Sequence, residues 1–405
     1  NQDVGTDRYI STLSTSVDSW IIDGKKVQST QKPTIVSSTL TWEKVTTLDL
    51  GLDARFFNDA LGVTFDWYNR TTSDILTTAN LPATLGADAP YENMGTIQTK
   101  GWELAIDYRH TFKNGLHFGV TASVADDKTE VTKWTYNTKI PSYGATGWWD
   151  KSAYKEGMVL GDIWGLQFDR FLTEDDFNAD GSLKAGLPDQ TKVFPAGYQF
   201  APGDVLYKDL DNNGEIVKQT NTNDKGDLSV IGNALPRLQF GLNLDAAWKG
   251  FDISMFFQGV AKRKLWAAGN QVLPGFTTGE PFYKGAEDYW TPENTDAFYP
   301  RPMDYKQSAS GNYSVNDRYL LNMAYLRLKT FTVGYSLPKV WLSKFKVQGL
   351  RVYFTGENLF TIDGVKPAID PEIGIRTAGT SSDQRNFGRS YPYQKTVSFG
   401  IQLSL

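Results

Sequence analysis

A short acidic segment in the middle of the chain has the residue types and spacing of a calcium-binding loop. Side-chain oxygens at positions 1, 3 and 5, a glycine at position 6, a backbone carbonyl at position 7 and an apolar residue at position 8 match the first half of such a loop. Hard oxygen donors at alternate positions can fold around one cation. The segment Asp209-Leu210-Asp211-Asn212-Asn213-Gly214-Glu215-Ile216 is therefore a candidate site for structural Ca2+, with the ligands Asp209, Asp211, Asn213 and Glu215.

The second half of this calcium loop is missing in register. Position 12, which usually supplies the closing carboxylate, is Thr220. A turn rich in Asp and Asn also folds without a metal, because these side chains accept hydrogen bonds from nearby backbone amides. The local sequence leaves both interpretations open.

Few other residues could carry covalent chemistry. The chain of 405 residues has no Cys, which excludes disulfides, thiolate zinc sites and cysteine nucleophiles. Its two histidines, His110 and His117, lie on either side of the turn sequence Lys113-Asn114-Gly115, as in a hairpin. Most carboxylates fall on polar strand faces or in turns, and no hydrolase or nucleotide-binding motif occurs in a suitable context. We therefore expect no enzyme activity.

The overall composition excludes several classes of protein. Lys and Arg number 41 against 46 Asp and Glu, and no block of like charge occurs, so a nucleic-acid partner has little support. With 14% aromatic residues the chain is too apolar to be disordered. The mean hydropathy is −0.40 and no run of 18 apolar residues exists. Helical membrane spans are therefore excluded, but a transmembrane β-barrel is not.

Strict alternation of apolar and polar residues is the main organising pattern, and such alternation predicts strands with one apolar and one polar face. It predicts hairpins from residues 47–56 and 61–70, from 102–109 and 116–124, and from 238–246 and 251–257. Later strands are predicted at 326–335, 350–354 and 397–405. Within 326–335 the phase slips at Lys329-Thr330, which indicates a β-bulge.

Short turns join about a dozen predicted strands on one side, and long segments join them on the other. The long segments lie near 128–158, 173–203, 263–320 and 361–392. Outer-membrane barrels have this asymmetry, and their polar faces line an aqueous lumen. A soluble β-sandwich also alternates, so a secreted carbohydrate-binding or adhesive β-protein is the alternative. The numerous charged and amide side chains on the polar strand faces favour the transmembrane antiparallel barrel.

Two of the long segments are rich in aromatic rings. Flat rings suit the apolar faces of sugars, and Tyr and Trp also suit protein interfaces. Packing within the loops is the simpler explanation for any single ring. Our candidates for substrate binding are Trp148, Trp149, Trp266 and Trp290.

Several short motifs, in the same order along the chain, resemble the SusC/RagA family of TonB-dependent outer-membrane transporters. They include Leu40-Thr41-Trp42-Glu43-Lys44, Asp66-Trp67-Tyr68-Asn69-Arg70, Lys100-Gly101-Trp102-Glu103-Leu104, Gly203-Asp204-Val205, Ile231-Gly232-Asn233-Ala234-Leu235-Pro236, Tyr325-Leu326-Arg327-Leu328-Lys329 and Gly356-Glu357-Asn358-Leu359-Phe360. The resemblance covers most of the chain. It also implies that Asp227, shortly before Ile231-Gly232, supplies the missing carboxylate of the calcium loop, with Asp224 as a second candidate.

The resemblance implies a fold, a location and partners. The chain would be the C-terminal portion of a 22-stranded β-barrel in the bacterial outer membrane, with the plug absent from this chain. It would work with a SusD-like surface lipoprotein and the TonB complex, and contact membrane lipid. The implied function is import of a bulky nutrient, most simply an oligosaccharide, with a peptide as the alternative substrate. One departure from the family is Leu405, where such barrels commonly end in Phe.

Overall fold

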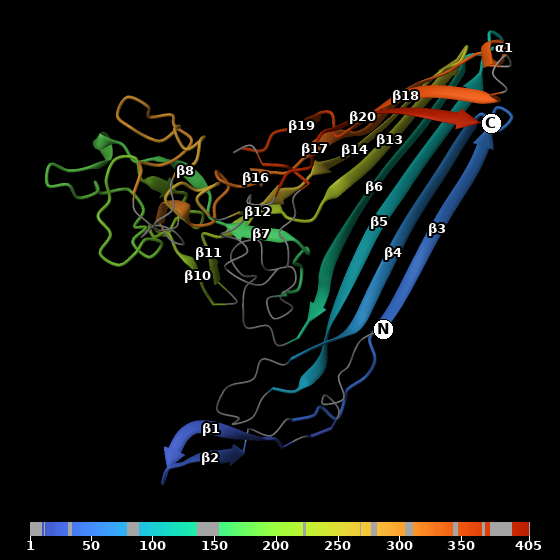
Figure 1. Cartoon of the computed structure of the whole chain (residues 1–405). Coiled ribbons are helices and arrows are strands. Elements are labelled where there is room, and N and C mark those ends of the chain that lie inside the picture. Colours follow the sequence, from blue (N-terminus) through green and yellow to red (C-terminus); the bar gives the residue numbers. More distant parts are fainter. Residues whose placement is uncertain are drawn as a thin grey trace.

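The dominant feature of the fold is one curved antiparallel sheet of ten strands (Figure 1). The computed structural model describes residues 10–11, 13–30, 35–78, 89–135, 154–221, 224–267, 269–276, 282–303, 311–342, 347–366, 369–372 and 391–404. The sheet contains β3 (Lys44–Phe56), β4 (Leu61–Thr78), β5 (Tyr91–Thr111), β6 (His117–Trp134), β13 (Arg237–Trp248), β14 (Phe251–Lys262), β17 (Tyr325–Ser336), β18 (Gly349–Glu357), β19 (Thr361–Asp363) and β20 (Thr396–Ser404).

The strand order is β20-β18-β17-β14-β13-β6-β5-β4-β3, with β19 paired to β17. All three predicted hairpins are present, as β3–β4, β5–β6 and β13–β14. Strand β6 continues to Trp134, so part of the segment expected as a loop near 128–158 is strand. The short turns lie together at one end of the sheet, and the long insertions leave from the other end (Figure 1).

The register gives the sheet two chemically different faces. One cross-strand row joins Val63, Ile106, Ala122, Leu242 and Phe257. The adjacent row, on the opposite face, joins Thr64, Ala105, Ser123, Gly241 and Gln258. Because side chains alternate between faces along every strand, the apolar–polar alternation of the sequence becomes one apolar and one polar face.

The predicted bulge in β17 is confirmed. Phe256 of β14 pairs with Thr330, whereas Phe257 pairs with Leu328, so Lys329 is the extra residue. A bulge of this kind leaves one residue unpaired and bends the strand locally. The bulge residue, Lys329, forms an ion pair with Glu372 in the segment that follows β19.

Glycines make room for long side chains that cross the polar face. At Gly62 in β4 an added Cβ would lie 2.4 Å from Arg55 Nη1 and 2.3 Å from Asp107 Oδ1. Arg55 and Asp107, in β3 and β5, form an ion pair of 2.7 Å above this glycine. Gly334 in β17 likewise leaves room for the side chain of Arg351, which crosses it and forms an ion pair with Asp252 in β14. A side chain at either glycine would therefore displace an ion pair that joins three strands.

The long insertions form a lobe at the far end of the sheet, built from described residues of 154–234 and 263–323 (Figure 1). It contains four short antiparallel pairs and two 3-10 turns, η4 (Glu174–Asp176) and η6 (Gly311–Tyr313). The pairs are β7 (Asp162–Gly165) with β12 (Ser229–Asn233), β8 (Phe168–Phe171) with β9 (Val205–Tyr207), β10 (Lys218–Asn221) with β11 (Asp224–Gly226), and β15 (Lys264–Leu265) with β16 (Leu321–Asn322). Two hydrophobic clusters lie in this lobe, so most of the buried core is here and not against the sheet.

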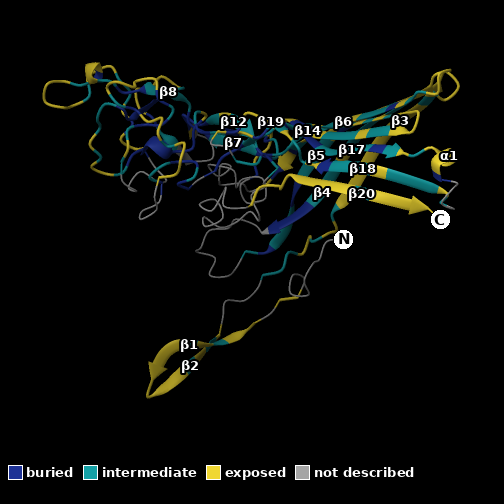
Figure 2. Ribbon diagram, turned by 45° about the horizontal axis from the view of Figure 1, so that its top comes forward, coloured by how far each residue is buried: buried dark blue, intermediate teal, exposed yellow. Residues whose placement is uncertain are grey.

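Two smaller elements project from the sheet. The hairpin of β1 (Thr15–Ile22) and β2 (Lys25–Thr30) extends away from the rest of the molecule and is largely exposed (Figure 2). The single turn of helix α1 (Lys339–Leu342) lies between β17 and β18 at the short-turn end. Among the described residues no helix is both long enough and apolar enough to cross a membrane.

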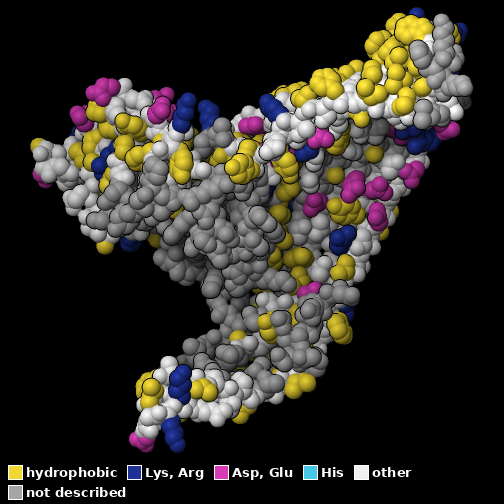
Figure 3. Space-filling model, viewed as in Figure 1, with side chains coloured by type: hydrophobic (Ala, Val, Ile, Leu, Met, Phe, Trp, Pro, Cys, Tyr) yellow, Lys and Arg dark blue, Asp and Glu magenta, His cyan; other side chains and the backbone are white. Residues whose placement is uncertain are grey.

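The sheet has two unpaired edges among the described strands. Strand β3 pairs only with β4, and β20 pairs only with β18. The edge strands carry exposed apolar side chains, among them Leu50 in β3 and Phe399 in β20, which are 59% and 82% exposed. Hydrophobic side chains gather on the outer surface toward the short-turn end (Figure 3). A surface of this kind is favourable in lipid and unfavourable in water.

Substitutions at two adjacent positions of β13 test which face of the sheet is apolar and which is polar. Leu242→Arg should place a charge on the lipid-facing side and destabilise the folded protein by up to about 2–4 kcal/mol. Asn243→Arg, one residue away on the polar face, should change stability by less than about 1 kcal/mol. Urea unfolding of both variants in lipid vesicles measures the difference, and equal losses of stability would contradict the assignment of the faces.

Candidate functional site

The polar face of the sheet forms an open cavity of about 540 Å³. Its lining comes from strands β4, β5, β6, β13 and β14, so it belongs to the wall and not to a loop. The polar residues that line it are Thr64, Asp66, Glu103, Thr121, Ser123, Gln239, Asn243 and Gln258. Hydroxyls, amides and carboxylates of this kind exchange hydrogen bonds with water or with a polar solute, and none of these groups is cationic.

Two carboxylates stand directly opposite each other in this wall. Asp66 of β4 pairs in register with Glu103 of β5. Like charges directly opposite on neighbouring strands are unfavourable. Both side chains line the cavity, where hydrogen-bond donors of a solute can offset the repulsion. They are the strongest acceptors on this stretch of the polar face.

The structure brings three of the predicted calcium ligands together. Asp209, Asp211 and Asp227 each offer a carboxylate oxygen, and these oxygens lie within 4.8 Å of one another. The β10–β11 hairpin lies between the acidic loop and Asp227 in the chain. Asp227 is fully buried, and its oxygens accept hydrogen bonds from the backbone N–H groups of Leu210 at 2.8 Å and Val217 at 2.7 Å.

The side chains of Asn213 and Glu215 make other contacts, although the motif assigns Glu215 through its backbone carbonyl and not through its carboxylate. The Asn213 amide oxygen accepts a hydrogen bond from the Glu215 backbone N–H at 2.7 Å, and its nitrogen donates to Asp211 at 3.1 Å. The Glu215 carboxylate forms an ion pair with Lys192. The side chains of Thr220 and Asp224 lie outside the described part of the chain. The donor set therefore fits a cation through Asp209, Asp211 and Asp227, and the Ca2+ site stays a prediction.

The two carboxylates of the loop have opposite shifts: desolvation raises the pKa of Asp209, but backbone N–H groups outweigh it and lower that pKa below its usual value. Partial desolvation, together with the neighbouring Asp227 and Asp209 carboxylates, raises the pKa of Asp211. Backbone N–H groups nevertheless hold the loop without a metal, since Gly214 donates to Asp209 at 2.8 Å. The metal-free turn considered from the sequence is thus compatible with the same backbone.

The four candidate tryptophans have different surroundings. Trp148 and Trp149 lie outside the described residues. Trp266 and Trp290 are 4% and 7% exposed and belong to the two hydrophobic clusters of the lobe. The Trp290 ring packs on Gly203, where an added Cβ would lie 2.5 Å from it. Both described tryptophans therefore pack within the loops, and substrate contact by them stays a prediction that this arrangement does not support.

A buried polar centre in the lobe was not recognised from the sequence. Asp204 is fully buried and accepts hydrogen bonds from Arg301 Nε at 2.8 Å, Tyr198 Oη at 2.9 Å and Asn312 Nδ2 at 2.9 Å. Arg301 and Asn312 come from a different insertion, about a hundred residues away. The only sequence signal for this centre was the family-like motif Gly203-Asp204-Val205. Its aspartate joins the two insertions into one lobe.

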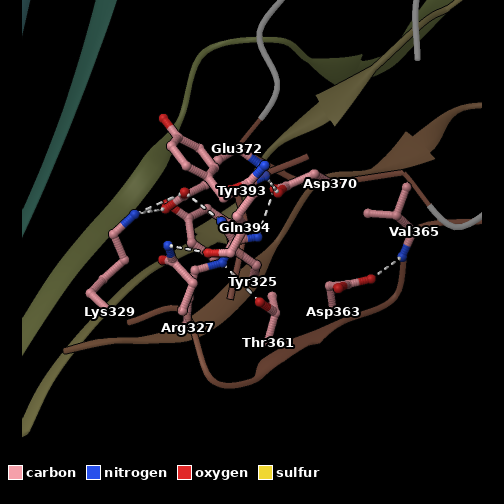
Figure 4. Close-up of polar contacts among 11 residues, drawn as sticks. Tyr325, Arg327, Lys329, Thr361, Asp363, Val365, Asp370, Glu372, Tyr393 and Gln394 are labelled. Atoms are coloured by element: carbon pink, nitrogen blue, oxygen red, sulfur yellow. Dashed lines mark hydrogen bonds and ion pairs between the residues drawn. The ribbon is translucent and has the colours of Figure 1, made fainter. Parts of the chain in front are cut away.

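A second buried network fixes the segment after β19 to the sheet (Figure 4). Arg327 of β17, whose side chain is 4% exposed, bonds Asp370 at 2.6 Å and Glu372 at 2.7 Å. Lys329, the bulge residue, and Tyr325 also reach Glu372, at 2.9 Å each. Burial opposes ionisation of Asp370, but the Arg327 guanidinium and two backbone N–H groups outweigh it and keep the pKa of Asp370 below its usual value.

The motif Tyr325-Leu326-Arg327-Leu328-Lys329 thereby acquires a structural meaning. Its alternate residues Tyr325, Arg327 and Lys329 converge on Glu372, since residues two apart along a strand point to the same side. The ring of Tyr393, just before β20, lies under both cations, 5.4 Å from Arg327 and 4.7 Å from Lys329. Two cations and two carboxylates thus neutralise one another in a buried site.

Comparison with known proteins agrees with this architecture. A sequence model of the family described as "TonB dependent receptor-like, beta-barrel" matches residues 6–359. The chain belongs to this family. Proteins of this β-barrel receptor family are outer-membrane proteins, and the chain is accordingly an outer-membrane protein. Its sheet is the corresponding partial barrel, with one face for lipid and one for the lumen.

Individual relatives of this β-barrel receptor extend well beyond the present chain. TonB-dependent receptor P3 of Formosa agariphila is 27% identical over 95% of this chain and 36% of its own length. TonB-dependent receptor SusC of Bacteroides thetaiotaomicron is 24% identical over 94% of this chain and 34% of its own. The RagAB peptide transporter structure superposes on the whole chain with a TM-score of 0.67 at 20% identity, covering 39% of that protein. The chain thus spans about a third of these relatives.

Removal of calcium tests the acidic loop. If Ca2+ joins the Asp209, Asp211 and Asp227 carboxylates, chelation should increase hydrogen exchange of residues 205–221 and 224–232, because the repulsion between these groups returns. Asp211→Asn should reduce the effect of the chelator. Exchange that is unchanged by chelator at pH 7 would rule out the ion and leave the metal-free turn.

The Arg327 network is expected to be a main stabilising contact of the outer segment. Arg327→Met leaves the buried Asp370 without a cation and Glu372 with Lys329 alone, and should cost about 3–5 kcal/mol. Lys128→Met removes an ion pair with Glu130 in which both partners are about half exposed, and should cost less than about 1 kcal/mol. Thermal unfolding and hydrogen exchange of 361–366 and 369–372 measure both variants. Equal losses of stability in the Arg327→Met and Lys128→Met variants would show that the Arg327 network is not a stabilising contact.

Proposed function

We propose that this chain forms part of the lumen wall of a TonB-dependent outer-membrane transporter that imports a bulky, mostly uncharged nutrient, an oligosaccharide. The observation that carries the proposal is the pair of sheet faces: apolar side chains outward, and hydroxyl, amide and carboxylate groups around the cavity on the polar face. A wall of this kind lets a hydrated solute pass while the other face lies in lipid.

The sheet would be completed by further strands outside this chain. Unpaired backbone N–H and C=O groups at the edges of β3 and β20 cost several kcal/mol each in a hydrocarbon environment. Closure into a barrel removes both edges. We accordingly propose that residues 1–405 are the C-terminal part of a larger barrel, with their long segments near 128–158, 173–203, 263–320 and 361–392 on the outer side.

The choice of a glycan over a peptide rests on the wall chemistry. Threonine, serine, asparagine and glutamine side chains around the cavity match the many hydroxyls of a sugar chain, and Asp66 with Glu103 adds strong acceptors. A peptide is the second candidate, because the similarly folded RagAB is a peptide transporter. A peptide carries charged termini and side chains, for which this part of the wall offers carboxylates but no cation.

The proposed assembly includes two partners. The resemblance to SusC and RagA supports a SusD-like surface lipoprotein above the lobe and energy from the TonB complex. The protein would have no enzyme activity of its own. In the described lobe, prominent carboxylates such as Asp176 and Asp204 are held by Arg170 and Arg301, which suits structural ion pairs better than acid–base catalysis.

Uptake by cells that express the whole transporter tests the proposal. Asp66→Ala with Glu103→Ala should slow uptake of a fluorescently labelled oligosaccharide at least about threefold, because two acceptors are lost from the wall. Glu174→Ala, which removes an exposed carboxylate from the lobe, is the control and should leave uptake unchanged. Normal uptake by the wall variant, or transport of peptides in place of glycans, would contradict the proposal.

A further inference from the structure

Two adjoining hollows in the lobe lie on either side of the segment Lys284–Glu287. One, of about 640 Å³, is lined by aromatic and proline side chains, and the other, of about 650 Å³, is lined mainly by charged ones. They share Lys284, Glu287 and Tyr299, so they adjoin at these residues, and the two hollows together are called the cleft here. Volumes of this size are typical of small-molecule sites.

The aromatic part of the cleft exposes rings at its rim. Phe282, Tyr283 and Tyr289 are 59%, 37% and 40% exposed. The buried rings of Tyr299 and Tyr313 lie deeper, and Tyr299 donates a hydrogen bond to the Val272 carbonyl at 3.0 Å, which fixes its position. An exposed ring can stack on the apolar face of a ligand, and this contact removes apolar surface of both from water.

The charged part of the cleft is electrically balanced. Its carboxylates are Glu287, Asp288 and Asp296, and its cations are Lys284, Arg318 and Lys366. Arg318 is occupied structurally, since it donates to the Phe298 carbonyl at 2.9 Å and lies 4.3 Å from the Phe168 ring. With no excess of either sign, the cleft favours a neutral ligand that has many hydrogen-bonding groups.

We propose that this cleft is an outer capture site for a neutral oligosaccharide, in which Tyr283 and Tyr289 stack on sugar rings and Glu287 and Lys284 bond their hydroxyls. A sugar ring presents an apolar C–H face and a rim of hydroxyls within one unit. That combination matches a cleft in which exposed rings and charged groups meet at Lys284 and Glu287. The inference rests on the proposed function and assigns a place where the substrate is first held.

The position of the cleft supports this role. Its lining residues, apart from Lys366, come from described residues of 263–323 in the lobe, whereas those of the wall cavity come from β4, β5, β6, β13 and β14. The lobe lies beyond the end of the sheet from which the long insertions leave (Figure 1). A ligand that arrives from the loop side meets the lobe before the wall. Loss of capture should therefore raise the substrate concentration needed for half-maximal uptake and leave the maximal rate unchanged.

Binding by the complete transporter with its lipoprotein, in detergent, tests the site. The probes are an array of neutral hexa- to octasaccharides and a proline-rich decapeptide, because proline-rich peptides also bind aromatic grooves. Wild-type protein should bind at least one glycan, and Tyr283→Ala with Tyr289→Ala should weaken that binding about tenfold. Tyr283→Phe with Tyr289→Phe keeps both rings and should retain most of the affinity, which separates stacking from loss of fold.

Each other outcome overturns the inference. Unchanged glycan affinity in the alanine variant, or binding of the decapeptide alone, shows that the cleft is not a glycan site. If wild-type cells take up the glycan and the alanine variant has the same half-saturation concentration, the capture site is wrong but the proposed function stands. If wild-type cells take up only peptides, the proposed function fails as well.

Discussion

Pairing of every backbone hydrogen-bonding group is the constraint on which this structure depends. In hydrocarbon there is no water to satisfy a free N–H or C=O, so strands cross only as part of a closed sheet. Each inner strand of the main path of the ten-strand sheet has a neighbour on both sides, whereas β3 and β20 have one neighbour each. The same requirement makes the side chains alternate between lipid and lumen, and this alternation gives a wall one apolar and one hydrophilic face.

Buried charges have a different role in the lobe. The lobe contains two hydrophobic clusters, and polar centres tie its distant insertions together in addition. Asp204 joins two insertions through Arg301 and Asn312, and Arg327 joins β17 to the segment after β19. Such sites are costly when one partner is absent and favourable when all are present. They therefore specify one arrangement of long loops that hydrophobic burial alone would leave loosely defined.

The strands could be predicted from the sequence because the period of two is a local property. Alternation located three hairpins, and a single slip of phase at Lys329 located the bulge. Pairing between distant residues has no such local signal. Nothing in the spacing joins Arg327 to Asp370, 43 residues later, or Asp204 to Asn312. The tryptophans show the same limit, because composition indicates a ring-rich loop but not whether Trp266 or Trp290 points inward.

The acidic loop was predicted partly from a local pattern and partly from the family resemblance. The local motif predicted Asp209 and Asp211, whereas Asp227 came only from the family resemblance, and the structure places all three carboxylates within 4.8 Å. Glu215 was included for its backbone carbonyl at position 7, and its side chain separately pairs with Lys192, which leaves the predicted role of the carbonyl untested. Motif spacing therefore located the turn well, and it located the side-chain directions only in part.

Labelling of single cysteines along β13 tests the central claim most directly. The chain has no native Cys, so each substitution adds the only thiol in this chain. A membrane-impermeant maleimide should react at the polar-face positions Gln239, Gly241, Asn243 and Asp245. Fluorophores at the alternate positions Phe240, Leu242, Leu244 and Ala246 should instead be quenched by lipid-attached quenchers. Reactivity without a period of two, or with the opposite phase, would contradict the account of this sheet as the wall of an outer-membrane lumen.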